Sequence, residues 1–186
     1  MVVKMMYSYK LKELREDKNI SQQDLSKELD IDNSLLAKYE KEYYIIPIKH
    51  LNTLANYFDV SIDYLFGLND KLNYKSSNCE IDAIKVGERL KEFRKENKLT
   101  QEKLAKILNM ARSALANYER GRNIIATPFL YTICTRYNIS ADYLLGKINN
   151  PKYLKYADDC NMHSFGSFRS WLVEWVRPIG RRNQPC

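Results

Sequence analysis

Apolar residues recur at intervals of three and four along most of the chain, the spacing of amphipathic α-helices. A short helix is predicted over Gln101–Leu108, directly after Thr100, a natural N-cap. Asn109 tolerates the left-handed conformation that ends a helix. A second helix is predicted over Arg112–Arg120, and Gly121 is placed to stop it. Two short helices joined by a tight turn predict a helix-turn-helix.

The hydrophobic pattern occurs twice. A shift of 79 positions aligns residues 11–67 with residues 90–146 without a gap, and 22 of these 57 positions are identical. The chain therefore carries two copies of one unit, each predicted to contain five helices and enough apolar residues for a small core of its own. We call residues 1–68 copy one and residues 81–150 copy two.

The predicted fold class is all-α: two tandem five-helix domains with a short C-terminal tail. The helices expected in copy one are Tyr7–Lys18, a helix capped by Ser21, Asn33–Lys41 capped by Asp32, Ile48–Phe58, and a helix capped by Ser61. Those expected in copy two are Val86–Asn97, Gln101–Leu108, Arg112–Arg120, Pro128–Tyr137 and Ala141–Leu145. Residues 69–80 are polar and rich in turn formers, which is typical of a linker.

The composition changes in the tail, residues 151–186. Every lysine lies at or before Lys155, whereas Trp171 and Trp175, the two tryptophans, lie beyond it. Two interpretations stand side by side. The residues after about 160 are a non-native extension, read through from a vector or recently added. Alternatively, the tail forms an extra helix with an aromatic face that binds a partner.

Charge points to a polyanionic partner. The net charge is +7 and the isoelectric point is near 9.1. The charge is uneven, because residues 1–70 sum to −3 and residues 80–150 to +5. The four cysteines have no zinc-like spacing, so we expect reduced thiols and no metal site. No apolar run has the length of a signal sequence or a membrane span, and we expect a cytoplasmic protein.

Three segments of copy two together resemble the phage repressor and Cro-type helix-turn-helix domain, often called the XRE family. They are Thr100-Gln101…Leu104-Ala105, Tyr118-Glu119-Arg120-Gly121 and Ile139-Ser140-Ala141-Asp142-Tyr143-Leu144-Leu145-Gly146. The resemblance implies a lambda-repressor-like fold and binding to double-stranded DNA. It also implies a nucleoid-associated protein encoded by a bacterium or a phage.

A recognition helix presents its N-terminal residues to base edges in the major groove. In copy two the face that reaches the bases is predicted to hold Arg112, Ser113, Ala116 and Asn117. The resemblance implies base contacts by Arg112, Ser113 and Asn117. The corresponding candidates in copy one are Asn33, Ser34 and Lys38.

Phosphate contacts are expected from the residues around the recognition helix. The family resemblance implies this role for Gln101 and Gln22 at the start of the preceding helix. Arg120, Arg122 and Asn123 follow the recognition helix of copy two and suit the DNA backbone. The resemblance further implies internal ion pairs between Arg94 and Glu119 and between Arg15 and Glu40.

Copy one departs from the family pattern. Glu42 replaces the glycine expected after the recognition helix, and the apolar stretch Tyr43–Ile46 follows it. A carboxylate and an apolar loop where phosphate is expected weaken the prediction of DNA binding by copy one. Copy one is therefore also a candidate for dimerisation, for binding another protein, or for reading DNA only as a tethered second module.

The function predicted from these observations is a sequence-specific DNA-binding transcriptional regulator, a repressor of phage or mobile-element type. The alternative is a protein-binding inhibitor or adaptor, like an anti-CRISPR protein or an antitoxin, that uses the same fold through copy one or the tail. A homodimer is compatible with both. We expect no enzyme activity, no catalytic residues and no cofactor, because His50 and His163 lack a nucleophile pattern and no phosphate-binding glycine loop occurs.

Overall fold

The computed structural model describes residues 7–69 and 80–151. Those residues form ten α-helices and no β-strand, and they fall within one compact unit, Met1–Lys155. The all-α class is therefore confirmed. Most of the predicted linker and the predicted tail helix lie outside the described residues.

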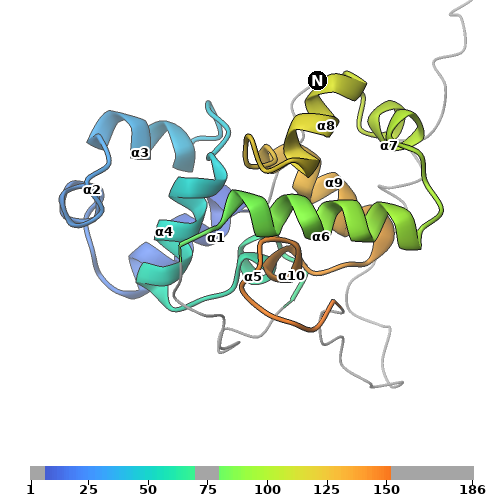
Figure 1. The fold of residues 1–186 in the computed structure, drawn as a ribbon. Coiled ribbons are helices and arrows are strands. Elements are labelled where there is room, and N and C mark those ends of the chain that lie inside the picture. The colour runs from blue at the N-terminus through green and yellow to red at the C-terminus, as the bar shows by residue number, and fades with distance from the viewer. Residues whose placement is uncertain (1–6, 70–79, 152–186) are drawn as a thin grey trace, which may run out of the picture. The chain divides into compact units, whose positions relative to one another are not determined.

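Each copy contributes five helices (Figure 1). Those of copy one are α1 (Tyr7–Asp17), α2 (Gln22–Glu28), α3 (Asn33–Glu40), α4 (Ile48–Phe58) and α5 (Ile62–Leu65). Those of copy two are α6 (Ala83–Glu96), α7 (Gln101–Ile107), α8 (Arg112–Glu119), α9 (Thr127–Tyr137) and α10 (Ala141–Leu144).

Side-chain caps set the starts of several helices. The hydroxyl of Ser21 accepts a hydrogen bond from the backbone N–H of Asp24 at 3.1 Å. Thr100 caps α7 in the same way, and Ser61 and Ser140 cap α5 and α10. These contacts satisfy backbone donors that the first turn of a helix leaves open. Each was predictable, because a cap acts within one turn of the chain.

The start of α6 differs from the prediction. The helix begins at Ala83, whereas the apolar pattern indicated Val86. The reason is a cap that the pattern does not contain: the carboxylate of Asp82 accepts a hydrogen bond from the N–H of Ile84 at 2.8 Å. The added turn carries Ile84, whose side chain is 61% exposed. This turn therefore adds no residue to the buried apolar stripe from which the start of the helix was predicted.

The two copies share one core. The buried apolar residues form a single cluster with members from both copies, instead of the two separate cores expected. Helix α5 packs against α10, as Figure 1 shows, and the ring of Phe66 meets that of Tyr131 edge-on at a centroid distance of 5.3 Å. Cys134 is fully buried in this core, as predicted for a structural thiol.

Among the described helices, none combines the length and the hydropathy that crossing a membrane requires. Residues 7–69 and 80–151 also contain no group of three or more histidine, cysteine or carboxylate side chains arranged to hold a metal ion.

Candidate nucleic-acid interface

The central feature of copy two is the pair α7 and α8 with its tight turn. Helix α7 ends at Ile107, and Asn109 takes a left-handed conformation with φ of 51°. The N–H of Met110 then returns to the carbonyl of Ala105 at 2.9 Å. Helix α8 starts two residues later, after Ala111, which makes no side-chain cap bond. A tight turn thus joins the two helices, as the sequence predicted.

An ion pair fixes α8 against α6. The Nε and Nη2 atoms of Arg94 donate to the two carboxylate oxygens of Glu119 at 2.5 and 3.0 Å, and Nη1 donates to the carbonyl of Leu99 at 2.9 Å. The Glu119 side chain is 3% exposed. Burial raises the pKa of Glu119, but the hydrogen bonds from Arg94 and Gln101 outweigh burial and leave that pKa below its usual value. The predicted structural role is confirmed, and Arg15 and Glu40 repeat it in copy one.

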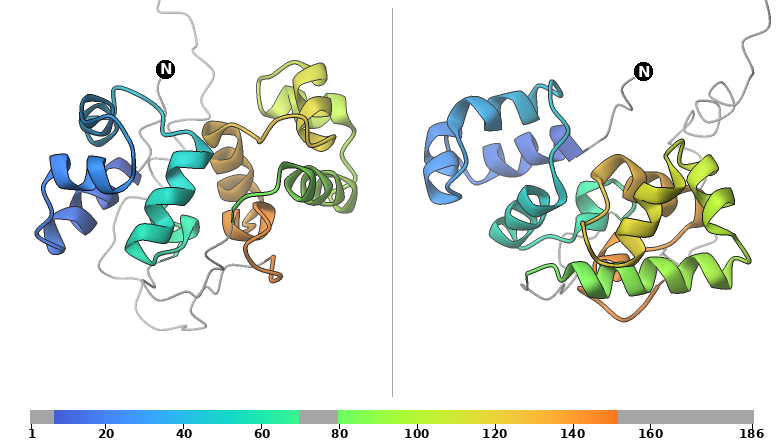
Figure 2. Two further views of the ribbon diagram at one scale, coloured as in Figure 1. Left: turned by 60° about the vertical axis from the view of Figure 1, so that its left-hand side comes forward. Right: turned by 45° about the horizontal axis from the view of Figure 1, so that its top comes forward.

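Close packing brings α8 onto α6 as well (Figure 2). A Cβ atom added to Gly87 would lie 2.5 Å from the carbonyl oxygen of Tyr118. Gly121, which follows α8, has φ of +68°, and a Cβ there would lie 2.7 Å from the Cα of Ile84. Both positions therefore require glycine if α8 and the residue that follows it are to pack this closely against α6.

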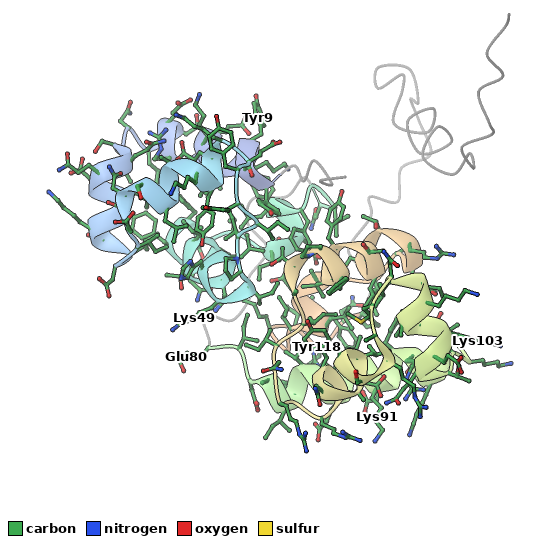
Figure 3. The ribbon with its side chains drawn as sticks, turned by 90° about the horizontal axis from the view of Figure 1, so that it is seen from above. Tyr9, Lys49, Glu80, Lys91, Lys103 and Tyr118 are labelled. Carbon is green, nitrogen blue, oxygen red and sulfur yellow. The ribbon has the colours of Figure 1, made fainter. Side chains whose placement is uncertain are left out.

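This anchoring leaves the start of α8 and the loop after it open. Arg112 and Ser113 are exposed, as are Arg120, Arg122 and Asn123, while Asn117 is half-buried. Ala116, which we expected on the outer face, is 9% exposed. Figure 3 shows two further basic side chains of copy two, Lys91 and Lys103, pointing outward from α6 and α7. The start of α8 and the loop after it therefore expose mainly basic and polar side chains.

Copy one presents different chemistry at the matching positions. Asn33 is exposed, but the hydroxyl of exposed Ser34 donates to the carboxylate of Asp32, the N-cap of α3, at 2.5 Å. The ammonium of Lys38 lies 5.4 Å from the ring centre of Tyr44. Two of the candidate base-reading side chains of copy one therefore have partners within the chain.

The loop after α3 is apolar and exposed. Tyr43 is 72% exposed, Tyr44 is 55% exposed and Ile45 is 48% exposed. Glu42 keeps the left-handed conformation of the glycine it replaces, with φ of 61°. The fold of the loop is thus conserved between the copies, while its side chains change from arginine and asparagine to tyrosine.

Two stretches of the chain match one known protein family. The helix-turn-helix domain family matches residues 8–71 and again residues 87–150, more than half of the chain. The chain belongs to this helix-turn-helix family. The double match is the repeat that the 79-residue shift predicted, and the family is the XRE type inferred from the motifs.

Three curated relatives share one such domain. The HTH-type transcriptional regulator ImmR of Bacillus subtilis is 42% identical over 64 residues, 34% of this chain and 50% of that protein. The antitoxin PezA of Streptococcus pneumoniae is 34% identical over 68 residues, 36% of this chain and 43% of PezA. The uncharacterized HTH-type transcriptional regulator YobD of Bacillus subtilis is 35% identical over 65 residues, 35% of this chain and 58% of YobD. The chain spans about half the length of these relatives.

Two solved structures are also similar. The restriction-modification controller protein C.AhdI of Aeromonas hydrophila is 32% identical and matches 34% of this chain and 96% of its own, with a TM-score of 0.32. A transcriptional regulator from Listeria innocua is 23% identical, covering 50% of this chain and 78% of its own, with a TM-score of 0.32.

The helix-turn-helix geometry adds detail to the predicted phosphate contacts. The side-chain amide of Gln101 donates to Glu119 at 2.9 Å, and that of Gln22 donates to Glu40 at 2.7 Å. Each glutamine therefore extends the ion pair that anchors its recognition helix. The phosphate role of both residues stays a prediction, as do the base contacts of Arg112, Ser113 and Asn117 and the phosphate contacts of Arg120, Arg122 and Asn123.

Proposed function

We propose that this helix-turn-helix protein binds double-stranded DNA sequence-specifically and represses transcription, in the manner of a phage or mobile-element regulator. Copy two is the principal reader. The protein acts by binding and not by catalysis, and the proposal carries a cytoplasmic location with it.

The observation that supports the proposal is the exposed start of α8, which carries Arg112 and Ser113. Arg112 is exposed at the first position of the helix, where a guanidinium can bind guanine O6 and N7 together. Asn117 lies on the next turn, within the reach of an adenine edge or a phosphate. The buried ion pair of Arg94 and Glu119 holds the helix that carries both side chains.

The phosphate backbone supplies affinity without sequence information. Arg120 and Arg122 are exposed in the loop after α8, beyond the N-terminal residues that a recognition helix presents to the bases. Neutralising phosphates releases counterions, so binding is expected to weaken steeply as salt is added. A salt-dependent affinity with base-dependent discrimination is the combination that the proposal requires.

Fluorescence anisotropy tests the proposal, with duplex DNA from upstream of the protein's own gene as the probe at two salt concentrations. The double variant Arg112→Ala/Asn117→Ala is expected to lose about tenfold or more in affinity, since one bidentate base contact is worth about 1–3 kcal/mol. Lys95→Ala is the matched control, because it removes one exposed positive charge from α6 and no candidate base contact.

Equal losses in the double variant and the control would show that charge alone drives binding, and the recognition-helix argument would fail. A companion variant, Asn33→Ala/Lys38→Ala, measures the share of copy one. If that variant loses binding to a protein partner but keeps its DNA affinity, copy one has the alternative function predicted from the sequence, that of a protein-binding inhibitor or adaptor.

A further inference from the structure

Helices α5 and α10 exchange caps across the contact between the copies. The N–H of Ala141, the first residue of α10, donates to the carboxyl group of Asp63 at 2.6 Å, and the hydroxyl of Ser140 donates to the same group at 2.5 Å. In return, the N–H of Asp63 donates to Asp142 at 2.8 Å. Asp63 and Asp142 are related by the 79-residue repeat. The contact is therefore reciprocal, as at the two-fold axis of a homodimer.

Away from this axis the two sides of the contact differ. On one side Phe66 of copy one meets Tyr131 of α9 edge-on. On the other side the ammonium of Lys147 donates to the amide oxygens of Asn52 and Asn56 on α4, at 2.7 and 2.8 Å. Lys147 is 5% exposed, so these two acceptors compensate a buried charge.

The repeat shows what pairing between like copies would do. The position of Asn52 in copy one is that of Tyr131 in copy two, and the position of Lys147 is that of Leu68. Two paired copies of the second kind would place Lys147 against tyrosine instead of the amide of Asn52. Two paired copies of the first kind would place Phe66 against an asparagine. Both like pairings bury a poorly matched polar group, so the contact selects unlike copies.

We propose that the α5–α10 contact is a dimer interface built into one chain and selective for unlike copies, so that a single chain presents α3 and α8 to one DNA site with two unlike halves. The presentation of both helices to DNA rests on the proposed function, whereas the internal dimer does not depend on it.

The reciprocal caps put both recognition helices in the same relation to the interface, because the 79-residue shift that relates Asp63 to Asp142 also relates α3 to α8. The side chains at the start of the two helices differ, with Asn33 where copy two has Arg112. The half-site of copy two is therefore expected to be read strongly and that of copy one weakly, each with its own sequence.

The test begins with the free full-length chain. Sedimentation velocity over a roughly hundredfold range of concentration is expected to give the monomer mass of 22.0 kDa throughout. Selection from random-sequence duplexes of about 40 base pairs then follows, long enough for half-sites one or two turns apart. We expect two unlike half-motifs at a fixed spacing, and light scattering of the complex should give one chain per duplex.

A free dimer, or a palindromic motif bound by two chains, would overturn the inference. Failure to enrich any motif would overturn both the proposed function and the proposed binding of one chain to a two-part DNA site. The internal dimer would still be tested independently by the mass of the free chain.

Variants at the contact between the copies test whether this contact fixes the spacing between the two half-motifs. Lys147→Ala is expected to broaden the spacing between the half-motifs and to weaken binding to the paired site by about tenfold, the equivalent of one charged hydrogen bond. Asn56→Ala, at a half-buried position, is a milder variant that removes one acceptor. Lys95→Ala on α6 is the control and should leave the spacing unchanged. Wild-type spacing and affinity in folded Lys147→Ala protein would contradict the inference.

Discussion

The paired carboxyl groups of Asp63 and Asp142 predict an unusual dependence of stability on pH. Asp63 is 2% exposed and Asp142 is fully buried. Burial raises the pKa of Asp63, and the neighbouring Asp142 raises it further. Burial also raises the pKa of Asp142, against the opposing influence of the backbone N–H of Asp63 and of Lys147. Two adjacent buried carboxyl groups cannot both ionise without cost, so the folded pair retains a proton.

The folded and unfolded states release this proton at different pH values. The unfolded carboxyl group loses its proton near pH 4, whereas the folded pair keeps one well above that pH. The stabilisation from this proton is therefore fully present below about pH 4. It declines as the pH rises above that value and is lost once the pH has passed the raised folded pKa. While one proton separates the two states, the free energy of unfolding falls by about 1.4 kcal/mol for each pH unit.

Urea unfolding at a series of pH values between about 5 and 8 measures this slope. The lower limit avoids the acid range, where protonation of Glu119, whose pKa is lowered, would destabilise the protein in the opposite sense. Asp63→Asn should flatten the slope, because a neutral amide keeps an acceptor for the N–H of Ala141 and needs no proton. Glu92→Gln, at an exposed position of α6, is the control. Identical slopes for wild type and Asp63→Asn would refute the reasoning.

Three further substitutions test the anchoring of the recognition helices, each by the midpoint of urea unfolding. Gly121→Ala should destabilise the protein by at least about 2 kcal/mol, from left-handed strain and the close approach to Ile84; an unchanged midpoint would contradict that packing. Glu42→Gly should stabilise it by about 1 kcal/mol, since it removes strain at φ of 61°, and a loss of stability would argue for an unrecognised Glu42 contact. Glu119→Ala should cost about 3 kcal/mol by leaving Arg94 without its partner, whereas a cost below about 1 kcal/mol would mean that the ion pair is dispensable.

Local signals made most of the fold predictable. Caps such as Ser21 and Thr100 act within one turn, so sequence alone places the helices they start. The ion pair of Arg94 and Glu119 was inferred from a family resemblance, since 25 residues separate the partners and no local rule connects them. The start of α6 was missed because the cap of Asp82 leads into a turn without buried apolar residues.

Side-chain direction at the site was harder to predict. The position of Gln101 at the start of α7 allows its amide to face solvent or Glu119, and the packing of α7 on α8 decides between them. Ala116 was placed outward because helical spacing gives the centre of a buried stripe and not its width. A periodic pattern therefore locates a recognition helix more reliably than it identifies the atoms that the helix exposes.

The contact between the copies lies beyond such patterns for a different reason. Asp63 and Asp142 each follow a helix cap, where a carboxylate is already favourable for its own helix, so neither signals a partner. The informative signal is instead the departure from the repeat. Asn52 and Leu68 become Tyr131 and Lys147 in the second copy, at positions that the structure brings into the contact or beside it. In a duplicated chain, differences that complement one another across an internal contact can mark the surface where the copies have adapted to each other.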